Sequence, residues 1–159
     1  LEDFENHLGT IFTEVRLKQV IELRSLDTCN FGCICNGPAF FTGLIYGSLE
    51  ETYEIIKNWK KEEVMEAYFN APKKGLNTLL NNKKLIDWGR IFLDLSKKGL
   101  EKRNEINKSG KNETIYLKHI EEIIENKKTR AEMLIEQFNK VKNLDFLVNH
   151  DENFSYSGF

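Results

Sequence analysis

Residues 14–24 read Glu14-Val-Arg-Leu-Lys-Gln-Val-Ile-Glu-Leu-Arg24 and differ in pattern from the rest of the chain. Apolar and polar side chains largely alternate along it, which is the period of a half-buried β-strand. After about residue 30 the apolar residues recur every three or four positions, as in amphipathic helices. We therefore expect a mostly helical α+β chain, in which one long strand or two short ones precede a helical subdomain.

The strand from Glu14 to Arg24 needs partners, because a sheet of roughly three or more strands is the minimum for independent stability. No second strong strand follows it in the sequence. Either residues 14–16 and 20–24 pair through a short, strained connection, or the other strands lie outside this chain. We favour the second arrangement, in which residues 1–30 are a helix and strands of a sheet largely missing from the chain, and residues 31–159 form the helical subdomain.

Composition excludes several classes of function. The 159 residues carry 23 basic and 25 acidic side chains, a net charge of −2, which gives no electrostatic footprint for nucleic acid or an anionic membrane. No apolar run approaches the roughly 18 residues of a membrane span. The acidic N-terminus lacks the features of a signal peptide, so we expect a cytoplasmic protein. The chain begins with Leu inside an expected helix, Asp3 to Ile11, which suggests a missing N-terminal part.

The remaining patterns predict helices and their caps. Ser48-x-x-Glu51 and Thr129-x-x-Glu132 have the form of capping boxes. The segment 72–82 is expected to be a connector, the helix after it is expected to end near Gly99, and 102–112 is expected to be a mobile loop. Three cysteines crowded between residues 29 and 35 are expected to be reduced thiols rather than a metal site. Large apolar residues at helical spacing are expected in the core, and these are Trp59, Trp88, Phe92, Ile120, Ile124 and Phe138.

The polar face of the strand admits two interpretations. The first interpretation is a solvated sheet face without a functional role, which the pattern alone favours. The other is a site for a metal and a phosphorylated substrate, because a carboxylate holds a hard cation while an arginine clamps phosphate with two hydrogen bonds. Such a face suits ATP-driven acyl phosphorylation, in which Mg²⁺ and guanidinium groups offset the phosphoryl charge. The residues on this face are Glu14, Arg16, Lys18, Glu22 and Arg24.

Three runs of this sequence resemble the C-terminal part of glutamate–cysteine ligase of the plant and proteobacterial type. They are Thr10-Ile-Phe-Thr-Glu-Val-Arg-Leu-Lys18, Ile21-Glu-Leu-Arg-Ser-Leu-Asp27 and Cys35-Asn-Gly-Pro-Ala-Phe-Phe-Thr-Gly-Leu-Ile-Tyr46. The likeness continues more weakly to about Val141. Thr13, where the family has Pro, and Ser25-Leu26, where it has Gly-Ala, depart from the pattern.

The resemblance implies a glutamine-synthetase-like fold and an enzyme that joins glutamate to cysteine. In that family ATP phosphorylates the γ-carboxylate of glutamate, and the amine of cysteine then displaces phosphate. The product would be γ-glutamylcysteine, the first intermediate of glutathione biosynthesis. The chain would then be a C-terminal fragment, inactive without the missing N-terminal part of the same enzyme.

The resemblance also assigns roles to individual residues. Glu22 matches a metal-ligating carboxylate, and Arg24 matches a catalytic arginine directed at phosphate or substrate. Arg16 is a second catalytic and phosphate-binding candidate, and Lys18 a further phosphate-binding candidate. Cys35 matches a cysteine that forms a redox-sensitive disulfide in plant members. The implied cofactors are ATP and Mg²⁺.

Two other functions stay open. The first is a related carboxylate–amine ligase with another acceptor. The second is a self-standing helical interaction module without catalytic work, which predicts that Glu14 to Arg24 is paired internally.

Overall fold

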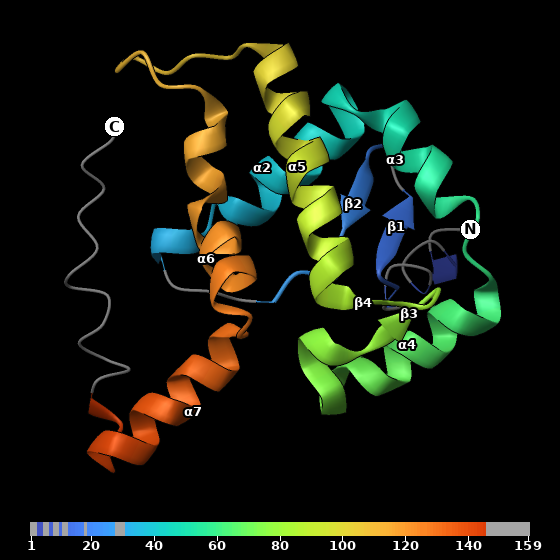
Figure 1. Cartoon of the computed structure of the whole chain (residues 1–159). Helices are drawn as coiled ribbons and strands as arrows, with labels where there is room; N and C mark the ends of the chain where they lie inside the picture. The colour runs from blue at the N-terminus through green and yellow to red at the C-terminus, as the bar shows by residue number, and fades with distance from the viewer. Residues whose placement is uncertain are drawn as a thin grey trace.

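The computed structural model describes residues 3, 4, 7, 10, 13–17, 19–27 and 31–145. Within them the chain is mostly helical with two small antiparallel sheets, which confirms the α+β class (Figure 1). Most of the expected helix Asp3 to Ile11 lies outside the described residues. The strands are β1 (Val15–Leu17), β2 (Ile21–Leu23), β3 (Leu79–Leu80) and β4 (Lys83–Lys84). The helical segments are η1 (Phe31–Cys33), α2 (Asn36–Thr42), η2 (Gly43–Gly47), α3 (Leu49–Ile56), α4 (Lys61–Lys74), η3 (Gly75–Asn77), α5 (Leu85–Arg103), η4 (Glu113–Leu117), α6 (Lys118–Asn126) and α7 (Arg130–Val141).

Helix α5 is the element against which most other helices pack (Figure 1). It has 19 residues, and α2, η2, η4 and α6 all contact it. Burying a large aliphatic side chain contributes about 1.5–3 kcal/mol, so the cluster at this junction holds α2, η4 and α6 on α5. The cluster consists of Ala39, Ile86, Leu93, Leu100, Leu117 and Ile124. In the described part of the chain, no helix is both long and apolar enough to cross a membrane.

A second apolar cluster joins α4 and the β3–β4 pair to α5. The indole Nε1 of Trp88 donates a hydrogen bond to the carbonyl oxygen of Leu80 at 2.8 Å. The Trp88 ring meets Trp59 edge to face with centroids 5.1 Å apart, and Phe92 lies 5.8 Å from Trp59. These contacts confirm the predicted core roles of the three aromatic residues. Phe138 was also predicted in the core, and that prediction is wrong, because its side chain on α7 is 37% exposed.

The helices α2 and η2 form one continuous segment that crosses α5 at very short range. The segment ends in a π-helical turn, in which the Ser48 N–H donates to the Gly43 carbonyl at 3.0 Å. At the crossing Gly43 faces Ser96, and Gly47 faces Gly99. A Cβ on Gly99 would lie 2.0 Å from the carbonyl oxygen of Gly43. Only a residue without a side chain fits there.

Two serine hydroxyls form hydrogen bonds across the same crossing. Ser96 donates to the carbonyl oxygen of Phe40, and Ser48 donates to that of Leu95, both at 2.9 Å. Helix α3 begins directly after Ser48, as predicted, but the Ser48 side chain makes no cap bond to it. The expected capping box with Glu51 is therefore absent, because the hydroxyl is used by α5.

Three segments differ from their prediction. Helix α5 runs through Gly99 to Arg103, since the glycine serves the crossing rather than a helix end. The predicted connector 72–82 contains the last turn of α4 and the β3–β4 turn, where two adjacent asparagines, Asn81 and Asn82, adopt positive φ. The loop 102–112 is closed by a bridge between Ile106 and Asn112.

Helix α7 extends away from α5 (Figure 1), and none of its residues is buried. Its predicted capping box is confirmed. The Thr129 hydroxyl accepts from the Glu132 N–H at 3.2 Å, and the Thr129 backbone N–H donates to the Glu132 carboxylate at 2.7 Å. The hydrogen bonds from the backbone and the side chain of Thr129 hold the pKa of Glu132 below its ordinary 4.5.

Replacing Gly99 by Ala should destabilise the fold by about 1–3 kcal/mol, because the new methyl group meets backbone atoms that cannot move aside. Gly89→Ala on the same helix is the matched control. There the nearest atom is the tip of the Ile124 side chain at 2.8 Å, which can rotate. Urea denaturation followed by circular dichroism measures both variants, and equal stability would contradict a backbone-to-backbone crossing.

The capping box should make α7 sensitive to acid. The pKa of Glu132 is lower in the folded chain than its ordinary 4.5. The stabilisation of α7 by the Glu132 carboxylate is therefore fully present above pH 4.5, and it is lost as the pH falls through the lowered pKa. The Thr129 amide resonance should therefore titrate below pH 4.5 in an NMR series. In Glu132→Gln this titration should vanish, and a Thr129 shift that persists there would rule the interaction out.

Candidate functional site

The candidate site lies on a hairpin formed by β1 and β2. The two strands pair antiparallel, with Val15 opposite Leu23 and Leu17 opposite Ile21. The Arg24 N–H extends the pairing by donating to the Glu14 carbonyl at 2.9 Å. Of the two arrangements considered from the sequence, the internal pairing that we did not favour is therefore present. A connection of three residues is long enough to reverse the chain, as in common hairpin loops.

The hairpin separates its side chains into two faces. Because successive side chains point to opposite sides of a strand, the even-numbered residues of both strands share one face. The register places Arg16 opposite Glu22, and the extra bond places Arg24 opposite Glu14. Residues of opposite charge thus lie opposite each other at both positions, and cross-strand pairs of this kind typically contribute roughly 0.2–1 kcal/mol each.

An ion pair between Arg16 and Glu22 is the centre of the polar face. The Arg16 Nε donates to Oε2 of Glu22 at 2.8 Å, and Nη2 lies 2.7 Å from the same oxygen. The Arg16 side chain is 20% exposed and that of Glu22 40% exposed. This face is therefore half-buried rather than fully solvated.

The other residues predicted for the site are distributed along the same face. Arg24 is half-buried and lies two positions beyond Glu22, directly after the end of β2. Glu14 accepts a hydrogen bond from the Tyr68 hydroxyl of α4 at 3.2 Å, a contact that the sequence pattern did not indicate. Lys18 lies outside the described residues.

The described residues do not build a metal site by themselves. Among them, no group of three or more His, Cys, Asp or Glu side chains is arranged to hold an ion. Glu22 is the one predicted ligand, and its carboxylate binds the Arg16 guanidinium. The hairpin alone therefore does not fit a Mg²⁺ ion, which prefers several oxygen ligands in octahedral geometry.

The cysteines differ in state. Cys35 is a free thiol, and Cys33 is in a disulfide, so the expectation of reduced thiols is wrong for Cys33.

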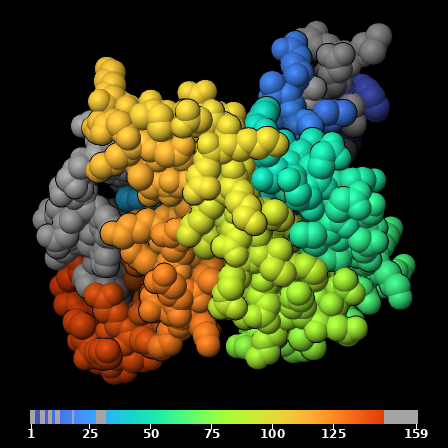
Figure 2. Space-filling view, turned by 45° about the horizontal axis from the view of Figure 1, so that its top comes forward, coloured from blue at the N-terminus to red at the C-terminus, as the bar shows by residue number. Residues whose placement is uncertain are grey.

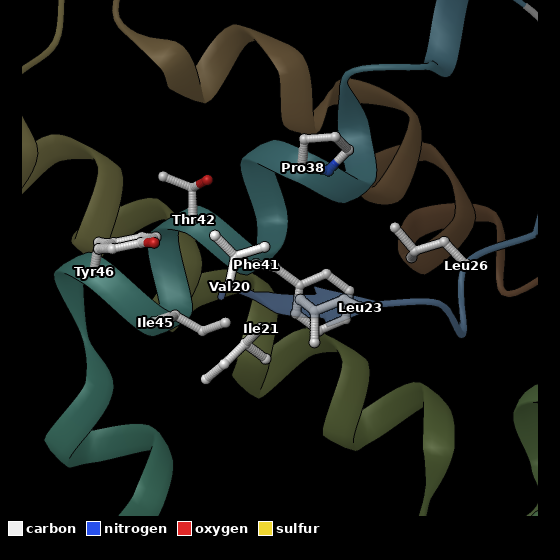
Figure 3. A pocket seen from close by; sticks show the side chains of 9 residues that line it. All are labelled: Val20, Ile21, Leu23, Leu26, Pro38, Phe41, Thr42, Ile45 and Tyr46. Atoms are coloured by element: carbon white, nitrogen blue, oxygen red, sulfur yellow. The ribbon is translucent and has the colours of Figure 1, made fainter. Parts of the chain in front are cut away.

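The opposite face of the hairpin borders an apolar groove of about 440 Å³ (Figure 3). One wall comes from the hairpin and from Leu26 in the segment after it, and the other comes from α2 and η2. The sequence pattern did not indicate this groove, because its two walls come from separate segments that only the fold brings together. The lining residues are Val20, Ile21, Leu23, Leu26, Pro38, Phe41, Thr42, Ile45 and Tyr46.

Comparison with known proteins gives the family. The sequence matches the model of glutamate-cysteine ligase family 2 over residues 1–150. The chain belongs to this family. Its resemblance to glutamate–cysteine ligases is thereby confirmed.

Curated plant ligases are similar to most of the chain. It is 36% identical over 140 residues to the chloroplastic glutamate–cysteine ligase of Solanum lycopersicum, which covers 87% of this chain and 26% of that protein. Ligase A of Oryza sativa subsp. indica is 36% identical over 137 residues, covering 85% and 27%. The Arabidopsis thaliana enzyme is 35% identical over 139 residues, covering 86% and 26%. This chain thus spans about a quarter of the length of these relatives.

The comparisons also correct the expected cytoplasmic location. All three of these ligases are named as chloroplastic, which contradicts that expectation. The expectation relied on the first residues of this chain. A chain that spans a quarter of its relatives need not begin where a targeting segment does.

A double-mutant cycle should detect the ion pair. We expect Arg16→Ala and Glu22→Gln to show a coupling free energy of about 0.5–1 kcal/mol, because the pair is only partly shielded from water. The exposed pair Lys128–Glu136, with side chains 45% and 52% exposed, is the control and should couple more weakly. Urea denaturation gives both values, and equal coupling in the two pairs would contradict the distinct burial of the hairpin pair.

Proposed function

We propose that this chain is part of an ATP-dependent glutamate–cysteine ligase and supplies one wall of its active site. In the first step a γ-carboxylate oxygen of glutamate attacks the γ-phosphorus of ATP, which releases ADP and forms γ-glutamyl phosphate. In the second, the amine of cysteine attacks the acyl carbon and phosphate leaves. The product is γ-glutamylcysteine, the first intermediate of glutathione synthesis. Family membership and the names of the relatives support this reaction.

The half-buried ion pair on the hairpin is the observation that carries the proposal. A guanidinium has five N–H donors in a planar fork, enough for Arg16 to bind Glu22 and a phosphate oxygen together. Arg24, on the same face, would contact the transferring phosphoryl group or glutamate. Lys18 would add a positive charge near the phosphates. These cations would stabilise the charge that spreads over the phosphoryl oxygens during transfer.

Glu22 would contribute one carboxylate ligand to Mg²⁺ in the complete enzyme. The remaining ligands would have to come from residues outside this chain, because the described residues offer no group of three. Bound Mg²⁺ would partly neutralise the negative charge of the ATP phosphates.

The fold, like the metal ligands, would be divided between this chain and the rest of the enzyme. We infer that residues 1–30 belong to a sheet of a glutamine-synthetase-like fold, and that residues 31–159 form the helical subdomain packed on it. The short hairpin β1–β2 suits this role, since two strands of three residues each are too small to be a stable sheet alone. The chain by itself would not catalyse the reaction.

Two alternative functions can be separated from this one. A related ligase with another acceptor amine would use the same hairpin, and a product assay with cysteine and other amines separates the two. The non-catalytic module gains some support from the internal pairing of the hairpin. Against it stand the half-buried polar face and the exposed apolar face, which a self-standing module would need to cover.

In the complete enzyme, Arg24→Ala should lower ATP- and glutamate-dependent phosphate release by roughly 100-fold or more, because removing one donor from a charge-stabilising site typically has this effect. Arg130→Ala on α7 is the matched control, since Arg130 is an exposed arginine on a helix without buried residues. It should release phosphate at the unmodified rate. Near-normal turnover of a correctly folded Arg24→Ala enzyme would refute the role of Arg24.

A further inference from the structure

The groove beside the hairpin is open and apolar. On the hairpin side, Val20 is 70% exposed and Ile21 66% exposed, and on the η2 side Tyr46 is 75% exposed. Leu17, which shares a face with Ile21, is 81% exposed. Figure 2 shows the hairpin, in blue, at one edge of the molecule beside the cyan-green segment that carries α3. A row of large apolar side chains on one side of a two-stranded sheet is a surface that proteins normally cover.

This groove is not a continuation of the phosphate-binding face. Ile21 and Leu23 point into it, and the alternation of a strand sends Glu22 to the opposite side of the hairpin (Figure 3). Its lining contains no charged side chain, and its side-chain polar groups are the hydroxyls of Thr42 and Tyr46. Such a surface does not suit ATP phosphates or the carboxylates of glutamate.

We propose that the groove, together with the apolar face of β1 and β2, is the surface on which the rest of the ligase docks through an extended apolar segment. This inference rests on the proposed function, in which the chain is one part of a larger enzyme. The rest of the ligase is the expected occupant because the chain spans only 26% of the length of relatives such as the Solanum lycopersicum ligase. An extended segment is favoured because its backbone could pair with an edge of the hairpin as a third strand, which brings the hairpin to the size of a stable sheet, while its apolar side chains cover the groove.

Docking at this place has a consequence for the active site. A segment on the apolar face of the hairpin would hold β1 and β2 at the boundary between the two parts of the enzyme. The Arg16–Glu22 pair on the reverse face would then be fixed relative to ligands that come from the other part. The exposed apolar residues of α7, such as Ile135 and Val141, lie on a helix that Figure 1 shows on the far side of α5, away from the hairpin. They offer a control surface.

Hydrogen exchange with mass spectrometry tests the proposal by comparing the 159-residue chain with the complete ligase that contains it. Peptides 13–27 and 38–46 should exchange at least about 10-fold more slowly in the complete ligase, because docking suppresses local opening. Leu17→Lys in the complete ligase should remove most of this protection. Leu17 is already exposed, so the substitution is compatible with the hairpin itself. Ile135→Lys should leave the protection unchanged.

Three results would overturn the proposal. They are equal exchange in the two proteins, protection that survives Leu17→Lys, and protection of both peptides in a dimer of the isolated chain. A glutamate-, cysteine- and ATP-dependent assay on the same samples separates this inference from the proposed function. Protection in a complete protein that lacks ligase activity would support docking while refuting the reaction, and activity without protection would do the reverse.

Discussion

The close crossing of η2 over α5 is the constraint on which the rest of the structure depends. Backbone meets backbone there, because Gly43, Gly47 and Gly99 carry no side chains, and Ser96 fills the remaining space with a hydroxyl that bonds across the junction. This contact holds the α2–η2 segment against α5 on one side. Its other side then presents Phe41 and Ile45 to the hairpin. The crossing therefore sets the position of the groove and of the strands beyond it.

The hairpin joins two different environments. Its polar face holds the Arg16–Glu22 pair in a half-buried setting, and its apolar face rests only partly on η2. A free-standing protein would bury the apolar face and solvate the polar one. In this chain the polar face is half-buried and the apolar face is largely exposed. This arrangement suits an element at the junction of two parts of an enzyme.

Sequence periodicity predicted the helices and most of the core, because spacing at three and four residues directly reports the buried side of a helix. It failed where one residue type has two uses. Gly99 was taken as a helix end, since glycine often follows a helix, but it lies at a helix crossing. Ser48 was taken as a cap for the same kind of reason. The strand pairing was missed because the cross-strand match of Arg16 with Glu22 appears only once the register is known, and the groove because it needs two distant segments to meet.

The π-helical turn limits how this region can change in length. Each residue of a helix rotates the next by roughly 100°, so gain or loss of one residue between 43 and 47 would turn Gly47 away from α5 and place a side chain at the junction. The loop between α5 and η4, closed by its own bridge, has no such restriction. Insertions and deletions among related sequences should accordingly gather in that loop and be excluded from the turn.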